Sequence, residues 1–236
     1  MNNTVVPVVT VDGPSGSGKG TICLELADRL GYTLLDSGAL YRIVAWAGLN
    51  QGLSLEDSSG LVHMIATLDI SFPYTAAIPG ASGGYYDICV NGKSIGEALR
   101  AEPVSVAASR VAAIAEVRTA LLTLQRQMRK APGLVADGRD MGTVVFPDAQ
   151  LKIFLTATAE ERAQRRYKQL IDKGLGVSLR ALLDSIRDRD ERDQTRAVSP
   201  LIPAADAIIV DSTHLSIEAV VQQILEYAEQ CGLLAR

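Results

Sequence analysis

A glycine-rich run near the N-terminus carries the clearest chemical signal in the sequence. The run Gly13-Pro14-Ser15-Gly16-Ser17-Gly18-Lys19-Gly20-Thr21 follows an apolar stretch, residues 5–11, and precedes a helical pattern, residues 22–31. This order of strand, turn, lysine and helix is typical of a phosphate-binding loop, in which backbone N–H groups surround an anion at the positive end of a helix dipole. Lys19 is expected to follow the β- and γ-phosphates of a nucleotide. A turn without a ligand is the alternative, and the lysine in register with strand and helix disfavours it.

The residue after Lys19 bears on magnesium binding. A Ser or Thr usually follows this lysine and offers its hydroxyl to Mg²⁺, but Gly20 stands here and Thr21 comes one position later. We therefore expect no direct protein ligand to Mg²⁺, and a hydrogen bond from Thr21 to a phosphate. Asp36 and Asp137 each end an apolar stretch and are candidates for orienting the metal's water shell. Capping of the following helix is the alternative role for such residues.

Further polar residues follow two of the expected strands. Ser37 and Arg42 come after residues 32–36, and Arg139 comes after residues 133–137. Because ligands gather at the carboxyl edge of a parallel sheet, these side chains are expected near the phosphate loop. An arginine there has an evident use, so we predict that Arg139 contacts a phosphate. Ser37 suits helix capping and ligand binding equally well.

Arginines gather in two expected helices that are separated by a pair of glycines. In each helix, three arginines are expected to share one face. They are Arg162, Arg165 and Arg166 in the first helix and Arg189, Arg192 and Arg196 in the second. Gly174 and Gly176 would form a hinge between the helices, so residues 158–196 are predicted to form an arginine-rich lid. Solvated helices with weak i,i+4 ion pairs are the alternative.

A lid of this kind suits phosphoryl transfer. Guanidinium groups neutralise charge on the migrating phosphoryl group, and closure excludes water that would otherwise take the phosphate. Two zones that handle phosphate imply two phosphorylated partners. The sequence therefore favours a kinase whose acceptor is itself a phosphate over one that acts on an alcohol.

Short apolar runs alternate with helical patterns along the chain. Their nearly continuous apolar character suits strands that are buried on both faces. The expected strands are residues 5–11, 32–36, 133–137, 151–155 and 207–211. Thr158 and Glu161 have capping-box spacing at the start of one helix, and Ser216 can cap the last. We predict an α/β fold of the P-loop nucleoside triphosphate hydrolase type, a five-stranded parallel sheet covered by helices.

One region interrupts this alternation. Residues 69–74 and 85–90 have the aromatic and β-branched character of strands, and Asn91-Gly92 suits a tight hairpin turn. We predict a small antiparallel subdomain inserted at about residues 69–96, with a disordered linker as the alternative. One long helix is expected to follow over residues 103–130.

Composition limits the classes of function. The 236 residues are 47% hydrophobic, enough for one sizeable core, so we expect a single domain, residues 1–236. A net charge of −4 disfavours general nucleic-acid binding. The three cysteines are scattered without metal spacing, and His63 and His214 are expected to be structural or surface residues. No apolar run is long enough to cross a bilayer, and the N-terminus does not resemble a signal peptide. We expect a cytoplasmic monomer without membrane or nucleic-acid partners.

Four segments together resemble the bacterial cytidylate kinase family. They are residues 13–21, 35–42, 136–147 and 189–193. The first alone would indicate only a phosphate-loop protein, but the other three together are specific, and the resemblance covers nearly the whole chain. It implies ATP-dependent phosphorylation of CMP and dCMP by in-line transfer, with Mg²⁺ accompanying ATP. A kinase for another nucleoside monophosphate, UMP or dTMP, is the alternative.

The resemblance also implies roles for individual residues. Residues 13–21 would bind ATP, residues 37–130 would form the monophosphate-binding region, and Lys19, Arg139 and Arg189 would be catalytic. The residues that match those holding the monophosphate in the family are Ser37, Arg42, Ser109, Arg118, Arg139, Asp140, Arg189, Asp193 and Arg196, with Tyr41 as a wall beside them. Of these, Asp140, Ser109 and Arg196 suit hydrogen bonds to cytosine.

Three other classes of function are disfavoured. A regulatory GTP switch would need an Asn/Thr-Lys-x-Asp segment to read guanine, and the sequence contains none. A kinase for a small alcohol would have no use for the cytosine-suited residues around Asp140. A nucleotide-binding module without turnover would have no need of Lys19 and the lid arginines.

Overall fold

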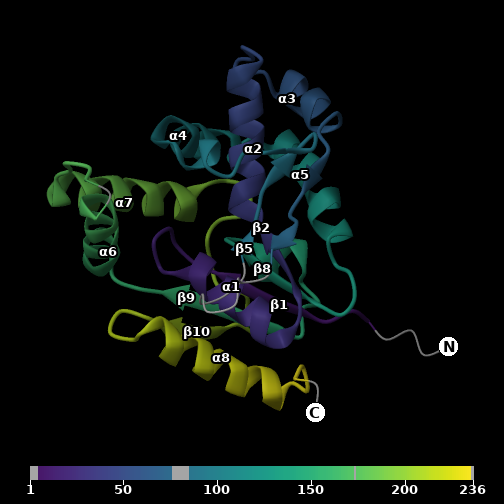
Figure 1. Ribbon diagram of the computed structural model, residues 1–236, viewed down its shortest axis with the longest axis vertical. Coiled ribbons are helices and arrows are strands. Elements are labelled where there is room, and N and C mark those ends of the chain that lie inside the picture. The colour runs from purple at the N-terminus through teal and green to yellow at the C-terminus, as the bar shows by residue number, and fades with distance from the viewer. Residues whose placement is uncertain (1–4, 76–84, 173, 235–236) are drawn as a thin grey trace.

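The computed structural model describes residues 5–75, 85–172 and 174–234. In these residues the main sheet has five strands, and its strand pairs are parallel. In spatial order the strands are β10 (Ile208–Asp211), β9 (Leu151–Thr156), β1 (Val8–Asp12), β8 (Leu134–Gly138) and β2 (Thr33–Asp36). The predicted α/β fold with a parallel sheet is confirmed, and Figure 1 shows the helices packed around it.

Helices cover both faces of this sheet. They are α1 (Lys19–Leu30), α2 (Ser37–Asn50), α3 (Ser58–Ile65), α4 (Glu102–Val111), α5 (Ala115–Gln127), α6 (Ala159–Ile171), α7 (Leu179–Thr195) and α8 (Ile217–Gln230). Side chains of β1 and β8 alternate between two separate cores. Val8 and Leu134 pack with α2 to α5, whereas Val9 and Val135 pack with α1 and α8. This double burial is why the strands are apolar at almost every position.

The chain between α3 and α4 contains the predicted antiparallel strands. One small sheet consists of β3 (Ile70–Ser71), β6 (Cys89–Val90) and β7 (Lys93–Ser94), and a second pairs β4 (Tyr74–Thr75) with β5 (Tyr85–Tyr86). Asn91 (φ 51°) and Gly92 (φ 72°) form the turn between β6 and β7, both in the left-handed region that a tight hairpin favours. A short 3₁₀ helix, η1 (Ala98–Arg100), follows. The predicted connection at residues 76–84 lies outside the described residues.

The expectation of one long helix over residues 103–130 is wrong. The chain breaks between α4 and α5, where Ile114 is extended (φ −82°, ψ 117°). No proline or glycine causes the break, which is why the sequence does not reveal it. Arg118 of α5 donates to the backbone oxygen of Ala112 at 3.1 Å, across the break. The interruption thus separates α4 from α5, and this hydrogen bond between residues six positions apart stabilises it.

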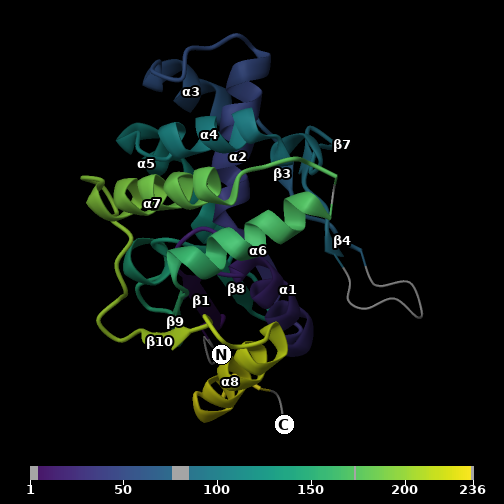
Figure 2. The ribbon, with the colours of Figure 1, turned by 90° about the vertical axis from the view of Figure 1, so that its left-hand side faces the viewer.

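The two arginine-rich helices, α6 and α7, lie side by side in both views of the molecule (Figures 1 and 2). The hydroxyl of Thr158 accepts the N–H of Glu161 at 3.2 Å, which confirms the predicted start of α6. Ser216 caps α8 in the same way, through the N–H of Ala219 at 3.1 Å. Among the described helices, none combines the length and the apolar character that crossing a membrane requires.

Candidate active site

A cavity of about 1100 Å³ lies at the carboxyl edge of the main sheet. The phosphate loop, the residues after β2 and β8, the helices α4 to α7 and the segment 212–217 form its wall. Every residue predicted to bind nucleotide lies in this wall except Gly13 and Pro14. The volume lies just above the usual range for sites that bind one small molecule. The fold therefore brings together residues that are far apart in the sequence, in a space wide enough for two substrates.

The phosphate loop connects β1 to α1 along this wall. Gly13 passes so close to β9 that an added Cβ would lie 2.0 Å from the Leu155 oxygen. Gly18 is left-handed (φ 95°, ψ 2°) at the start of α1, and no side chain caps the helix. The first N–H groups of α1 therefore lie at the cavity with the positive end of the helix dipole, where an anion would satisfy them.

Lys19 is buried at the first position of α1. Its ammonium group donates to the backbone oxygen of Pro14 at 2.8 Å. Burial lowers the pKa of Lys19 below its ordinary value, and the nearby charge of Asp137 opposes that shift. A desolvated cation that is held inside the loop is well placed to contact a phosphate, because few waters compete for it.

The two aspartates at the strand ends differ in their surroundings. Asp36 caps α2 by accepting the N–H of Ala39 at 2.8 Å, and its other carboxylate oxygen accepts from Arg42 at 2.8 Å. Ser37, for which capping was the alternative, is buried as the first residue of α2 and lines the cavity. The carboxylate of Asp137 lies beside the phosphate loop near Gly20, and desolvation raises its pKa to about 6. Of the two carboxylates, Asp36 is therefore the one that is already engaged by hydrogen bonds within the protein.

A buried ion pair also lines the cavity. Arg118 donates to Asp140, and both side chains are more than 90% buried. The guanidinium carbon of Arg118 lies 5.6 Å from the ring centre of Tyr41, within range of a cation–π interaction. These three residues thus support one another's positions, and each still lines the cavity.

Three more arginines, Arg139, Arg189 and Arg196, line the same cavity. Arg139 donates to Asp193, so the end of β8 is joined to α7. Desolvation lowers the pKa of Arg189 to about 10, and the charge of Arg139 adds to the shift. Among the described residues, the Nε of Arg189 and one terminal nitrogen of Arg196 are buried without a hydrogen-bond partner. An anion would supply these partners and relieve the repulsion between the cations.

The prediction that three arginines share one face is wrong for the second arginine-rich helix, and in the first helix the three arginines share a face but differ in their surroundings. Arg189 and Arg196 line the cavity, but Arg192 is exposed and its Nε donates to the Asp188 backbone oxygen at 3.1 Å. Helix α7 ends at Thr195, so Arg196 is placed by an extended backbone (ψ 139°) and not by the helical period. In α6, Arg165 lines the cavity, whereas Arg162 is buried elsewhere and Arg166 is exposed.

Part of the wall was not expected from the sequence. The segment 212–217, which runs from the end of β10 to the first residue of α8, lines the cavity together with residues of α6. Arg165 crosses from α6 to this segment and donates to the Ser212 oxygen at 2.6 Å. His214 is exposed, as expected, but it also lines the cavity. No sequence motif marks this segment, because it reaches the cavity only through the position of β10 beside β9 in the sheet.

Asp12, the last residue of β1, is another residue that the sequence reasoning missed. It is buried, and its two oxygens accept the N–H groups of Met141 and Gly142, both at 2.8 Å. These donors begin a short π-helix, η2 (Met141–Val145), directly after Arg139 and Asp140. Desolvation outweighs the two donors and raises the pKa of Asp12 to about 7. Asp12 therefore connects the root of the phosphate loop to the segment that carries Arg139 and Asp140.

Asp12→Asn is expected to reduce the pH dependence of folding stability between about pH 4 and pH 7. With a pKa of about 7 in the fold against an ordinary 3.8, folded Asp12 holds a proton that the unfolded chain releases. The contribution of Asp12 to the free energy of unfolding is therefore complete below its ordinary pKa. It falls as pH rises to its folded pKa, by at most about 1.4 kcal/mol per pH unit. Urea unfolding of the wild type and of the variant at several pH values measures how the free energy of unfolding of each depends on pH. An unchanged slope in the variant would contradict the assignment.

Comparison with known proteins identifies relatives over almost the whole chain. The family model described as cytidylate kinase matches residues 9–230. A cytidylate kinase of Pseudomonas aeruginosa is 56% identical over 230 residues, covering 98% of this chain and 98% of that protein. A cytidylate kinase of Aeromonas hydrophila is 53% identical over 226 residues, covering 96% of this chain and 95% of that protein.

A solved structure shares the fold at much lower identity. An uncharacterized protein from Eubacterium ventriosum aligns with a TM-score of 0.50 and 11% identity, covering 95% of this chain and 99% of that one. At this identity the likeness concerns the fold alone.

Proposed function

The chain belongs to the cytidylate kinase family and phosphorylates CMP and dCMP with ATP, and we propose that both substrates meet in the cavity at the edge of the sheet. The observation that carries this proposal is the continuity of one cavity from the phosphate loop to the cluster of arginines and aspartates. A phosphoryl group could pass between two nucleotides there without leaving the protein.

ATP occupies the end of the cavity formed by the phosphate loop in this proposal. Residues 13–21 surround its phosphates, and the backbone N–H groups at the start of α1 supply the donors. The base and ribose lie between α6 and the segment 212–217, where Arg165 and His214 line the wall. This arrangement directs the γ-phosphate toward Arg139 and Arg189.

The monophosphate occupies the other end. Ser37, Arg42, Arg139 and Arg189 surround its phosphate, and Asp193 orients Arg139 through their ion pair. Cytosine lies among Ser109, Arg118, Asp140 and Arg196, with Tyr41 as a wall. Cytosine presents acceptors at O2 and N3 and a donor at N4, and the serine, arginines and carboxylate complement these groups.

Transfer depends on position and charge more than on proton chemistry. The attacking phosphate oxygen is already ionised at neutral pH, so the site needs no general base. Lys19, Arg139 and Arg189 neutralise the charge that spreads over the migrating group. The lid helices α6 and α7 exclude water, which would otherwise take the phosphoryl group.

Mg²⁺ would accompany ATP, and the available residues fit it. This ion retains several waters and is usually held by one or two carboxylates together with phosphate oxygens. Asp137 lies beside the loop at Gly20 and would orient those waters, while Asp36 is committed to Ala39 and Arg42. Among the described residues, no cluster of three or more acids, histidines or cysteines could hold a metal by itself. The bound ion would neutralise charge on the phosphates.

A monomeric state and a cytoplasmic location, where ATP and nucleoside monophosphates are supplied, belong to the same proposal. So does the absence of a nucleic-acid partner, which the net charge of −4 supports. No observation favours UMP or dTMP as the preferred acceptor.

A panel of acceptors tests the substrate assignment. ADP release would be measured with Mg-ATP and CMP, dCMP, UMP, dTMP, AMP or GMP. Turnover led by CMP or dCMP is the expected result. Fastest turnover with another monophosphate would be compatible with the fold and the lid but would overturn the assignment of the cytosine pocket. The absence of turnover with every acceptor would overturn the proposal.

A further inference from the structure

Arg162 is buried outside the nucleotide cavity, although it belongs to the arginine-rich lid. Its side chain is 4% exposed, and it does not form part of the cavity wall in the described residues. Its Nε donates to the Ala157 oxygen at 3.0 Å, and one terminal nitrogen donates to the Ser15 oxygen at 3.0 Å. Both terminal nitrogens also donate to the carboxylate of Asp190. Because every nitrogen of this guanidinium group already donates to the protein, and the side chain does not line the cavity, we assign Arg162 a role other than contact with substrate.

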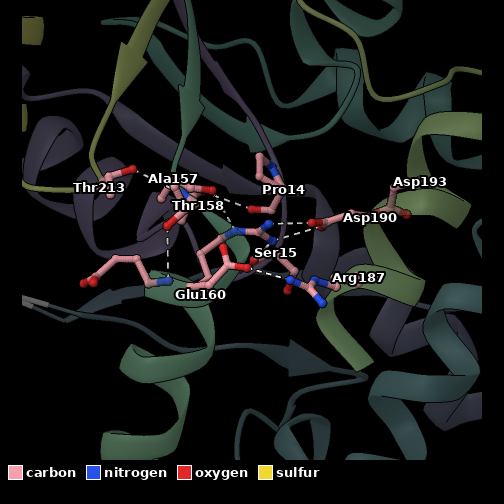
Figure 3. Close-up of polar contacts among 12 residues, drawn as sticks. Pro14, Ser15, Ala157, Thr158, Glu160, Arg187, Asp190, Asp193 and Thr213 are labelled. Atoms are coloured by element: carbon pink, nitrogen blue, oxygen red, sulfur yellow. Dashed lines mark hydrogen bonds and ion pairs between the residues drawn. The ribbon is translucent and has the colours of Figure 1, made fainter. Parts of the chain in front are cut away.

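These contacts join three parts of the molecule. Ser15 belongs to the phosphate loop, Ala157 lies between β9 and α6, and Asp190 belongs to α7, and Figure 3 shows the three converging. The side chain of Arg162 also packs against the loop, since an added Cβ at Gly16 would lie 3.4 Å from its Cβ. Arg162 therefore holds a lid helix and the phosphate loop at one fixed separation.

The position of Asp190 gives this link a consequence for the site. Asp190 directly follows Arg189 in α7. Arg189 lines the cavity, and within the described part of the chain its Nε is buried without a hydrogen-bond partner. A bidentate pair fixes geometry as well as charge. Because adjacent residues on a helix turn together, anchoring Asp190 also sets the direction in which Arg189 projects.

We propose that Arg162 is a positioning residue, which aims Arg189 at the phosphates by binding Asp190 and the phosphate loop together. The inference rests on the proposed contact of Arg189 with the phosphates. Arg162 acts through Arg189, and its own guanidinium group stays away from the reacting atoms.

A second ion pair provides a matched control. Arg187 of α7 donates to Glu160 of α6 at 2.7 Å, so it joins the same two helices. It is exposed, with 58% of the Arg187 side chain and 61% of the Glu160 side chain accessible. The Arg187–Glu160 pair, also visible in Figure 3, includes no contact with the phosphate loop in the described residues. If joining α6 to α7 were sufficient to position Arg189, loss of either ion pair would lower kcat by a similar factor.

A double-mutant cycle between Arg162 and Arg189 tests the proposal. Arg162→Lys keeps the charge but cannot make the same set of bonds, and it is expected to lower kcat about 10- to 100-fold through misplacement of Arg189. Arg189→Lys alone should lower kcat about 100-fold. In the Arg189→Lys background, Arg162→Lys should cost less than about threefold, because the group that it positions is already gone. Arg187→Gln should stay within about twofold of the wild type.

Each outcome bears on a separate claim. Equal losses from Arg162→Lys in both backgrounds would overturn the inference, since a merely structural residue acts independently of Arg189. A loss from Arg187→Gln as large as that from Arg162→Lys would also overturn it. An unchanged kcat in Arg189→Lys would overturn the proposed role of Arg189 and, with it, the inference. If Arg162→Lys fails to fold, Asp190→Asn tests the same link in the same cycle, and thermal unfolding of each variant verifies its fold.

Discussion

Replacing Lys19 with alanine is expected to lower kcat about a thousandfold while leaving the fold intact. Lys19 is the buried cation of the phosphate loop, and its ammonium group makes one hydrogen bond, to the Pro14 oxygen, in the described residues. Its charge acts in a desolvated site, where electrostatic stabilisation of transferred charge is strongest. The loss of one backbone contact at the start of α1 costs far less than the loss of that stabilisation.

Steady-state kinetics with Mg-ATP and CMP measures this loss, and circular dichroism verifies the fold. Lys152 provides the control, because it is also buried and also donates to a proline oxygen, that of Pro147 at 2.7 Å. It lies on β9 outside the cavity wall and pairs with Asp206. Lys152→Met should keep kcat within about twofold. Near-normal turnover in Lys19→Ala would contradict the catalytic role of Lys19.

The second large effect is expected from Arg196→Ala, which should lower kcat/KM for CMP about 10- to 100-fold and leave KM for ATP within about twofold. Arg196 lines the cavity near Arg118 and Asp140, and one of its terminal nitrogens is buried without a partner in the described residues. A hydrogen bond from a charged donor is worth roughly 1.5–3 kcal/mol. Removal of this donor should therefore weaken the binding of the monophosphate and leave the binding of the triphosphate unchanged.

Arg192 is the matched control for this variant, four residues earlier in the same lid. It is exposed, donates to the Asp188 oxygen and is absent from the main cavity wall. Arg192→Ala should leave the kinetics of both nucleotides unchanged within about twofold. Isothermal titration with each nucleotide separately gives the two affinities. Equal weakening of ATP and CMP by Arg196→Ala would remove Arg196 from the cytosine pocket.

Local chemistry was predictable from sequence wherever one segment carries both its structure and its function. The phosphate loop is such a segment, because the glycines, the lysine and the flanking apolar runs follow one another within residues 5–31. The strands were predictable for a related reason, since burial on both faces leaves a continuous apolar run. The cap residues Thr158 and Ser216 bond to N–H groups three residues later, and both were recognised.

The cytosine-suited residues were found by resemblance and not by pattern. Ser109, Arg118 and Asp140 come from α4, α5 and the end of β8. No helical or strand period relates them. Their meeting depends on the break between α4 and α5, which no proline or glycine marks.

Tertiary structure alone decided which arginines serve the site. Arg162, Arg192 and Arg196 carry the same guanidinium group in the same lid, yet one is buried against the phosphate loop, one is exposed and one faces the cavity. Asp12 was overlooked for the same reason, since its partners, Met141 and Gly142, lie far along the chain. A sequence displays the kind and spacing of charges, but the free energy of each charge depends on what the fold packs around it. Burial and partners come from distant segments, so the role of each charge was settled only when those segments came together.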